Sequence, residues 1–418
     1  MNKEKTVLFI TTRLPFPTTS GRKTSLYNYC KIIKKQGYKL VVASFDDNYD
    51  LKLKPDFIDE LLILSNTNKI TKLCNILKYS FITRKYPLQV SLYYDKKIKQ
   101  KINEIVKKIN PQIVIADMVR TTEYLKDIEN VIKVADLDDR LSLRYKRQLE
   151  CDINEVNPYG LFLNSLPKFI QRTIMMNFVK KTVMKNEIKL LEKYELNIGK
   201  TTDYTVFVAE NETNSFNSEL GENKAITIPI GVDIEYYKNI EDINAVKNNY
   251  IGFLGVLNVS HNENAVKRFI KDILPLVLEK NYDAKFIVIG GGATEELLSL
   301  KNESVIFMGR VEDVRNYLRK CKVFVSPLSF GSGIKTKNLE AMSLGIPVIT
   351  TSIGAENINA IDKKDWYIEN ENSKIASRIC ELLNDSKKAY EIGKNGSNYV
   401  SNNFTWKVSE ENFKKILK

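Results

Sequence analysis

The chain has 418 residues, too many for a single hydrophobic core, and this length suits two domains of roughly 200 residues each. Its composition is 43% hydrophobic and 28% charged, which is typical of a globular protein and excludes an intrinsically disordered chain. The net charge of +13 arises mainly from residues 1–230, with 38 Lys and Arg against 27 Asp and Glu, whereas residues 231–418 have 26 against 24. This asymmetry favours an anionic partner for the first half. Nucleic acid is not expected, since no module interleaves aromatic and basic residues.

Five cysteines are scattered along the chain without any close pair: Cys30, Cys74, Cys151, Cys321 and Cys380. Their odd number and wide spacing predict buried, reduced thiols rather than a disulfide framework or a metal site. The apolar stretch at 6–12 is too short for a signal peptide, and no apolar run has the length of a membrane span. We therefore expect a cytoplasmic protein.

The first half of the chain reads as an alternation of strands and helices. A strand at 6–11, a loop at 15–21, a helix at 23–36 and a strand at 38–44 form a βαβ opening. Further strands are expected at 60–64, 112–116, 131–135 and 204–208. The helix-length segments between them predict a parallel sheet covered on both faces.

Carboxylates follow two of these strands. Asp117 and Arg120 come after the strand at 112–116, where they either orient an acceptor or serve as a helix-capping acid and a surface base. Asp136, Asp138 and Asp139 come after the strand at 131–135. Such a run is found in metal sites, but it is as readily explained by helix capping, and we expect no bound metal.

Residues 159–193 combine many apolar side chains with seven Lys and Arg and only two acids, Glu187 and Glu192. A helix of this kind could lie on an anionic membrane, on the inner face of the cell envelope. The favoured alternative is a helical pair whose apolar side docks on its own domain while its lysines face water.

The second half begins a new series of alternating elements. Strands are expected at 250–254, 284–289, 304–307, 322–326 and 347–350, and the last helices at 373–385, 387–403 and 406–417. The pattern predicts two Rossmann-like, doubly wound α/β domains, at 1–235 and 245–400, with ligands at the carboxyl ends of their strands. The turn at 288–292 ends a strand in three glycines but lacks the spacing of a dinucleotide-binding motif.

Residues 326–349 carry the strongest functional signal in the chain. After the apolar strand, the small residues Gly331, Ser332 and Gly333 can bring backbone N–H groups close to a ligand at the start of a helix. Lys335 and Lys337 supply two cations, and Glu340 supplies a carboxylate that can bind sugar hydroxyls. This combination predicts a site for a nucleotide sugar.

This segment resembles the donor-binding region of the family 4 glycosyltransferases of GT-B fold, over about 24 residues. The resemblance follows a bacterial branch with the pattern PL-x-x-GSG-x-x-x-K-x-LEAM-x-x-G-x-PV. Weaker similarities span most of the chain: Gly21, 87–90, 231–233, 255–262 and 309–311. The fold that it implies has two domains facing each other across a cleft, with the helix at 405–418 packing back on the first.

The resemblance also implies residue roles. Lys335 and Lys337 would neutralise the departing diphosphate, and Glu340 would bind the ribose of the nucleotide. The remaining donor contacts would come from a set of loop residues: Gly255, Asn262, Gly309, Arg310, Val311, Gly331, Ser332, Gly333 and Ile334. Gly21, Asp117 and Arg120 would lie on the acceptor side. Relatives usually have a glutamate where this chain has Ser332, which leaves the contacts of the donor sugar open.

The only histidine of the chain, His261, lies in the loop segment after the first strand of the second half. It is a candidate general base, although in the resemblance its position is a loop residue near the donor. Lys267 and Arg268 lie further along, in the middle of an expected helix, and we do not assign them a role.

The leading hypothesis is a metal-independent, cofactor-independent, retaining glycosyltransferase that uses a nucleoside diphosphate sugar and a lipid-linked or polysaccharide acceptor. One rival is a nucleotide-sugar epimerase of GT-B fold, which would need several proton-transferring side chains in its site. The other is an inactive glycan-binding partner subunit, which the departure at Ser332 keeps open.

Overall fold

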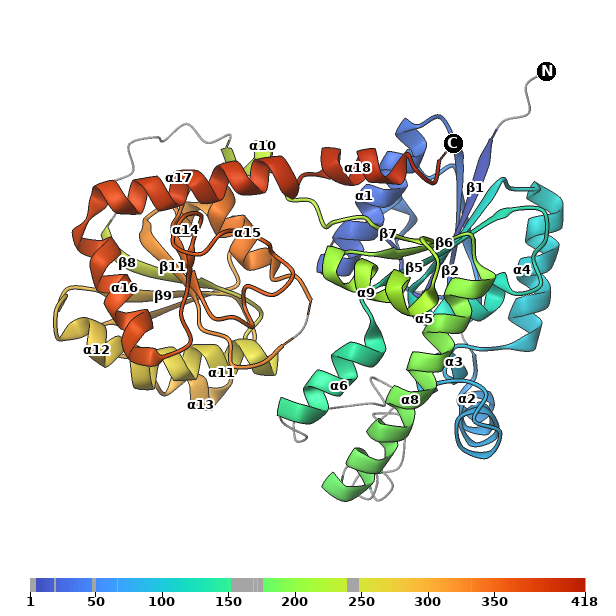
Figure 1. Ribbon diagram of the computed structural model, residues 1–418, viewed down its shortest axis with the longest axis horizontal. Helices are drawn as coiled ribbons and strands as arrows, with labels where there is room; N and C mark the ends of the chain where they lie inside the picture. Colours follow the sequence, from blue (N-terminus) through green and yellow to red (C-terminus); the bar gives the residue numbers. More distant parts are fainter. Residues whose placement is uncertain are drawn as a thin grey trace. The chain divides into compact units, whose positions relative to one another are not determined.

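The computed structural model describes residues 5–18, 20–46, 50–65, 67–151, 168, 171, 176–238, 248–331 and 333–417. The chain divides into two compact units. Unit 1 comprises Met1–Pro229 and Glu410–Lys418, and unit 2 comprises Ile230–Ser409. Each unit is an α/β structure built on its own parallel sheet (Figure 1).

Unit 1 contains a seven-stranded parallel sheet in the order β3-β2-β1-β4-β5-β6-β7. The inner strand β1 has four consecutive apolar residues, 7–10, that are fully buried because helices cover both faces of the sheet. The strands are β1 (Thr6–Thr11), β2 (Lys39–Ser44), β3 (Glu60–Ile63), β4 (Ile113–Asp117), β5 (Ile132–Asp138), β6 (Tyr204–Phe207) and β7 (Ala225–Thr227).

The helices of unit 1 follow the strands in alternation. They are α1 (Gly21–Lys35), α2 (Lys69–Asn75), η2 (Ile76–Ile82), α3 (Leu88–Ser91), α4 (Lys96–Ile109), α5 (Met118–Thr121), α6 (Leu141–Cys151), α8 (Asn177–Thr201) and α9 (Glu210–Leu220), with short 3-10 turns η1 (Leu51–Leu53) and η3 (Thr122–Leu125). Helix α1 begins at Gly21, so Gly21 is helical rather than part of the expected loop.

The end of the chain completes unit 1. Helix α18 (Trp406–Phe413) brings Glu410 to α1, where its carboxylate pairs with Lys35 at 2.7 Å and accepts a hydrogen bond from Gln36 at 2.9 Å. The ring of Phe413 lies 5.1 Å from that of Tyr29, centroid to centroid. These contacts attach residues from the far end of the sequence to the first helix of the chain.

Helix α8 occupies most of the described part of the segment 159–193. From Met184 onward most of its apolar residues pack into the core of unit 1, whereas Phe178 at its start is 81% exposed. Its exposed lysines face water: Lys181, Lys185, Lys189 and Lys193. The docked alternative therefore holds for α8 from Met184 onward, where the apolar face is not available to a membrane. Most of residues 159–175 lie outside the described part of the chain.

Unit 2 contains a six-stranded parallel sheet in the order β10-β9-β8-β11-β12-β13. Its strands are β8 (Asn248–Leu254), β9 (Lys285–Ile289), β10 (Val305–Gly309), β11 (Cys321–Ser326), β12 (Val348–Thr350) and β13 (Tyr367–Ile368). Its helices are α10 (Ile234–Lys238), α11 (Ser260–Arg268), η6 (Phe269–Ile273), α12 (Leu274–Leu278), α13 (Glu295–Leu298), α14 (Arg315–Leu318), α15 (Thr336–Ser343), α16 (Asn372–Asn384) and α17 (Ser386–Asn403).

One sequence prediction needs correction at this level. The prediction of buried thiols holds for Cys30, Cys321 and Cys380, but Cys74 is exposed on α2, because it lies on the outward face of that helix. In the described part of the chain, every helix falls short of the length and apolarity that crossing a membrane requires.

Candidate functional site

The strand order of unit 2 produces a topological switch point at the carboxyl edge of the sheet. Strands β8 and β11 are neighbours, and the chain leaves them toward opposite sides of the sheet, with β9 and β10 on one side and β12 and β13 on the other. Ligands of open α/β sheets bind at such a switch point, outside the carboxyl ends of the strands. The loops after β8 and β11 are therefore the expected ligand-binding region of unit 2.

Glycines let the loops after β8 and β9 touch through their backbones. Gly290 has φ +142°, and a Cβ atom at this position would lie 1.9 Å from the carbonyl oxygen of Gly255. The N–H of Gly255 donates to the carbonyl of Ile289 at 3.0 Å, and that of Leu257 donates to Gly291 at 2.8 Å. Any side chain at 290 would separate the two loops, so glycine is required there for close packing.

The loop after β11 has two further glycines in conformations that other residues rarely adopt. Gly331 has φ +141° and Gly333 has φ +70°. The loop leads into α15, and the ammonium of Lys335 donates to the carbonyl oxygen of Gly333 at 2.7 Å. Backbone donors at the positive end of a helix suit an anion. Ser332, in the same loop, lies outside the described residues.

Lys337 links the two sides of the switch point. Its ammonium donates to the side-chain oxygen of Asn262, on α11, and lies 4.5 Å from the ring centroid of Phe253 on β8. Burial, together with the nearby charge of Lys335, lowers the pKa of Lys337 to about 7. Two cations held close together in a poorly solvated place favour the arrival of an anion, which would stabilise both.

Asn262 fixes the position of the Lys337 ammonium. Its side-chain NH₂ donates to the carbonyl oxygen of Val256 at 2.9 Å, so its oxygen is left to accept from Lys337. A Cβ atom at Gly255 would lie 2.9 Å from Asn262 and 3.0 Å from the ammonium of Lys337. The predicted donor residues Gly255, Asn262 and Lys337 are thus brought together in one contact.

His261 lies at the start of α11, with its ring centroid 6.4 Å from that of Phe330. Burial and the positive charges of Lys337 and Lys335 lower its pKa to about 4. The imidazole is therefore neutral at pH 7 and a weak base. This environment does not favour His261 as a general base, whose pKa should lie near the working pH.

Glu340 is held by a partner that the sequence did not reveal. Its carboxylate accepts hydrogen bonds from the hydroxyls of Tyr237, on α10, and of Thr336, one turn earlier in α15. Burial raises the pKa of Glu340. Tyr237 lies about a hundred residues before Glu340, and no local pattern marks the pair.

The turn after β10 places Gly309, Arg310 and Val311 at the same edge of the sheet. Gly309 has φ +68° and its N–H and carbonyl lie beside β9, where its oxygen accepts from the N–H of Gly290 at 2.9 Å. The side chain of Arg310 is exposed. Ile334 is partly buried against the core of unit 2.

Lys267 and Arg268 belong to α11 and have structural partners. Lys267 pairs with Glu263 and Glu296, both at 3.0 Å. The guanidinium of Arg268 donates to the backbone carbonyls of Pro327 and Asn370 and to Asn372. Neither side chain is directed at the lysine pair, in agreement with leaving both without a role.

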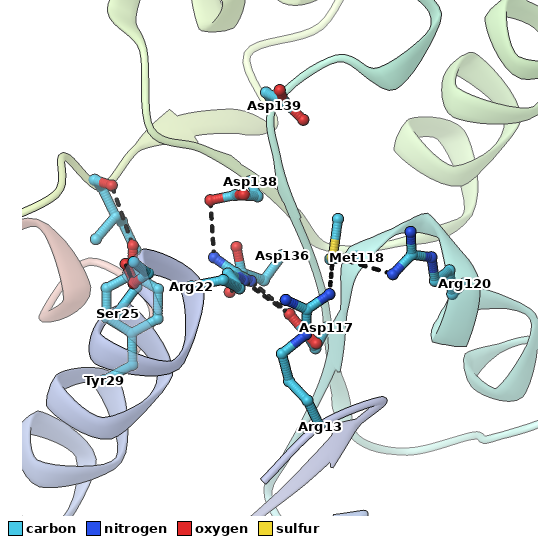
Figure 2. A network of polar contacts seen from close by, with 12 residues as sticks. Arg13, Arg22, Ser25, Tyr29, Asp117, Met118, Arg120, Asp136, Asp138 and Asp139 are labelled. Atoms are coloured by element: carbon cyan, nitrogen blue, oxygen red, sulfur yellow. Dashed lines mark hydrogen bonds and ion pairs between the residues drawn. The ribbon is translucent and has the colours of Figure 1, made fainter. Parts of the chain in front are cut away.

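At the carboxyl edge of the sheet of unit 1, carboxylates outnumber cations, in contrast to the lysine pair of unit 2. Arg22, in the first turn of α1, contacts three aspartates, as Figure 2 shows. Its guanidinium lies 2.6 Å from Asp117, 2.7 Å from Asp136 and 2.9 Å from Asp138. Burial raises the pKa of Asp136 to about 7, against the opposing charge of Arg22. This cluster is a buried ionic network with more carboxylates than cations.

The network corrects several predictions for unit 1. Asp117 is fully buried and its side chain caps no helix, because it accepts two hydrogen bonds from Arg22. Asp136 and Asp138 likewise pair with Arg22, and Asp139 pairs with Arg144, so capping does not account for the run. Within the described ranges, His, Cys, Asp and Glu side chains do not gather in threes that would suit a metal ion.

Arg120 lies apart from Asp117. Its guanidinium donates to the side-chain oxygen of Gln89 at 2.9 Å and stacks over Tyr93 at 5.5 Å, and it approaches the sulfur of Met118 at 4.0 Å. Arg13 approaches the same sulfur from the other side at 3.9 Å (Figure 2). Gly21 has open space where a Cβ atom would lie. The predicted acceptor residues therefore form no single contact in unit 1.

Comparison with known proteins finds a family match within unit 2. Residues 248–385 match the family model described as "Glycosyl transferases group 1". These residues form a group 1 glycosyltransferase domain. The domain contains the lysine pair, Asn262, Glu340 and all the glycine loops of the switch point.

Two relatives match more of the chain than residues 248–385. The capsular polysaccharide biosynthesis glycosyltransferase CapM of Staphylococcus aureus is 24% identical over 355 residues, which cover 77% of this chain and 88% of CapM. A GDP-mannose-dependent monoacylated alpha-(1-6)-phosphatidylinositol monomannoside mannosyltransferase of Corynebacterium glutamicum is 26% identical over 53% of this chain and 63% of its own.

Solved structures extend the fold similarity from the group 1 glycosyltransferase domain to the whole chain. The Anabaena protein HepE, solved in complex with UDP, aligns with a TM-score of 0.63 at 14% identity, covering 99% of each chain. At this identity the similarity concerns the fold. The fold class is GT-B, with two Rossmann-like α/β domains, as predicted from the sequence.

Proposed function

We propose that this protein transfers a sugar from a nucleoside diphosphate sugar to a hydroxyl acceptor. The observation that carries the proposal is the convergence of Lys335, Lys337 and the glycine loops at the switch point of unit 2. A diphosphate is the ligand whose charge and size suit two neighbouring ammonium groups and backbone N–H donors. The similar mannosyltransferase of Corynebacterium glutamicum is GDP-mannose-dependent, and HepE was solved in complex with UDP.

In the proposed reaction the bond between the anomeric carbon and the diphosphate oxygen breaks while the acceptor oxygen bonds to the same carbon. The acceptor proton passes to the departing phosphate oxygen on the same face, which gives retention without an enzymic nucleophile. Lys335 and Lys337 stabilise the negative charge that grows on the leaving group, and no metal is required for this. A bound diphosphate would place negative charge beside Lys337, whose pKa is lowered to about 7 by burial and by the charge of Lys335.

Glu340 is proposed to accept hydrogen bonds from the ribose hydroxyls of the nucleotide. The carboxylate is already oriented by Tyr237 and Thr336. Two oxygens of a carboxylate can accept several hydrogen bonds, so these partners leave capacity for the ribose. The acceptor is proposed to be a lipid-linked or polysaccharide intermediate, a class supported by the similarity to CapM, a glycosyltransferase of capsular polysaccharide biosynthesis.

The test is incubation of the protein with a panel of radiolabelled UDP-, GDP- and dTDP-sugars, with and without a membrane lipid extract as the source of acceptor. We expect label to move from one nucleotide sugar into the extract, in the presence of EDTA as well as without it. Interconversion of the sugar without acceptor would instead identify an epimerase, and binding without either reaction would identify an inactive partner subunit. Each of these two results would contradict the proposal.

A further inference from the structure

Helix α2 continues without a break into the π-helical segment η2, and one side of this rod is apolar and open to solvent. We call its five large apolar side chains the 70–82 stripe. The exposed fractions are 76% for Ile70, 46% for Leu73, 51% for Leu77, 43% for Phe81 and 78% for Ile82. Single exposed apolar residues are common on protein surfaces, but five on one short helical segment need an explanation.

The spacing places four of these five side chains on one face, and Ile82 follows directly after the last of them. Residues 70, 73, 77 and 81 follow each other at intervals of three and four, which brings helical residues into one row. Cys74, which is also exposed, lies beside the row. An amphipathic surface helix normally turns such a row toward the core of its own domain. In this protein the row points the other way.

The opposite face explains the orientation. Asn75 donates to the backbone carbonyls of Tyr94 at 2.6 Å and Ser91 at 3.2 Å, and the hydroxyl of Ser80 pairs with that of Ser91 at 2.8 Å. Ile76 packs with two buried leucines of the next helical segment, Leu88 and Leu92. These contacts fix the rotation of the rod, so the 70–82 stripe cannot turn inward without breaking buried hydrogen bonds.

The charge around the stripe is of one sign. The sequence from 61 to 94 contains no Asp or Glu, and its five basic residues all lie on or next to the rod: Lys69, Lys72, Lys78, Arg84 and Lys85. Lys69, Lys78, Arg84 and Lys85 are exposed. An apolar row flanked by cations, in a segment that contains no acid, complements a surface that is apolar inside and anionic at its boundary.

We propose that the 70–82 stripe docks unit 1 on an anionic phospholipid bilayer, with the apolar side chains inserted among the acyl chains and the basic side chains at the phosphate groups. The sequence suggested a membrane contact at 159–193, but the apolar face of α8 from Met184 onward is buried in the core of unit 1. The contact is therefore assigned to the 70–82 stripe. It does not depend on the proposed sugar transfer, since the stripe and the lysine pair share no residue.

The test uses the full chain and sedimentation with vesicles of phosphatidylglycerol and of phosphatidylcholine. We expect binding to phosphatidylglycerol vesicles that weakens as salt is raised, and much weaker binding to phosphatidylcholine. The triple variant Ile70→Ser, Leu77→Ser, Ile82→Ser should lower the partition coefficient at least about tenfold. All three side chains are exposed, so the variant should keep the unfolding transition of the wild type.

A matched control removes three exposed apolar side chains from unit 2, with the substitutions Tyr282→Ser, Leu298→Ser and Ile361→Ser. This variant should bind phosphatidylglycerol vesicles as the wild type does. Phe178→Ser, at the exposed start of α8, tests the rival segment in the same assay and should also have no effect. Loss of binding in the Phe178→Ser variant with full binding in the triple variant would overturn the proposal.

Cys74 provides a second, local readout. In a Cys151→Ser background its thiol is the exposed one among Cys30, Cys74, Cys321 and Cys380. An environment-sensitive fluorophore attached to Cys74 should shift to shorter wavelength when phosphatidylglycerol vesicles are added, because its surroundings become apolar. A wild type that ignores both kinds of vesicle would overturn the proposal. Concentration-dependent self-association that the triple variant abolishes would, in that case, assign the stripe to a second copy of the chain.

Discussion

The two units have the same kind of sheet and opposite chemistry at its carboxyl edge. In unit 2 the switch point between β8 and β11 contains two lysines and close-packed glycine backbone. In unit 1 the corresponding point between β1 and β4 is filled by Arg22 and three aspartates that surround it. A shared topology therefore fixes where ligands can bind, while the side chains at that edge decide which ligand is possible.

The difference also concerns charge balance. The three aspartates of unit 1 already have a cation, so the cluster is satisfied in part without a ligand. In unit 2, burial and the charge of Lys335 lower the pKa of Lys337, and the opposing charge of Glu340 is too weak to offset them. An added anion would therefore stabilise the lysine pair of unit 2 and not the aspartate cluster of unit 1. Four predictions test this comparison, from the largest expected effect to the smallest.

Arg22→Ala should destabilise unit 1 most. The change leaves three aspartates at the edge of the sheet without their cation, two of them buried, and loss of one partner from such a network costs about 3–5 kcal/mol. Chemical denaturation with hydrogen exchange resolved for each unit measures the effect. The control Lys374→Ala removes a solvent-exposed pair with Glu371 and should leave the unfolding transition close to that of the wild type. A stable Arg22→Ala variant would show that the aspartates need no cation.

Gly290→Ala should destabilise unit 2 by about 2–3 kcal/mol, because the new Cβ atom would collide with the Gly255 carbonyl and the φ of +142° is strained for alanine. Gly221→Ala, at the end of α9, provides the control: its φ is +74° but it has open space around the Cβ position, so only about 1 kcal/mol is expected. Denaturation of both variants separates the collision from the backbone strain. Equal losses would mean that the two loops are not held in contact.

Lys337→Ala should lower the rate of sugar transfer at least about tenfold, which corresponds to about 1.4 kcal/mol, because the diphosphate leaving group loses a cation. Glu340→Ala should have an effect of similar size through the ribose. Initial rates with the donor identified by the radiolabelled panel measure both. Lys267→Ala removes a lysine of the neighbouring helix α11 that pairs with Glu263, and its rate should match the wild type. Near-normal rates for Lys337→Ala and Glu340→Ala together would remove the proposed site.

The affinity for a nucleoside diphosphate should fall as the pH rises above about 7. Below that pH the Lys337 ammonium is charged before binding, whereas above it the binding of an anion must also take up a proton. For one such proton the loss reaches at most about tenfold per pH unit. Calorimetric titration with UDP and GDP at several pH values measures it. Lys337→Arg should flatten the profile, because a guanidinium stays charged; an unchanged slope would exclude Lys337 as the titrating group.

Much of the fold could be predicted because the central strands are uninterrupted apolar runs. The strands β1 and β11 were placed within one residue of the structure, since fully buried parallel strands leave this local signal. The two-residue strand β13 was missed, because two residues are too few to show a period. The part of the site in unit 2 that follows β11 could be recognised because two glycines, both lysines and Glu340 lie within ten residues of one another, at 331–340.

The rest of the site depends on pairs that are distant in sequence. Arg22 meets aspartates 95 to 116 residues away, and Tyr237 reaches Glu340 from another helix, so no local pattern marks either contact. The orientation of the 70–82 stripe is a third feature that the local sequence does not predict. Its apolar spacing is readable in the sequence, but whether the row faces the core or the solvent is decided by Asn75 and Ser80 and their partners in 91–94.

The placement of Glu410 and Phe413 against α1 has a consequence for biosynthesis. The ribosome makes all of unit 2 before it makes these residues, so the domain begun first is the last to be finished. Until the final segment emerges, the surface of Tyr29 and its neighbours lacks its cover and is open to improper association. A chain cut before residue 410 should therefore leave a complete second domain attached to an incomplete first one.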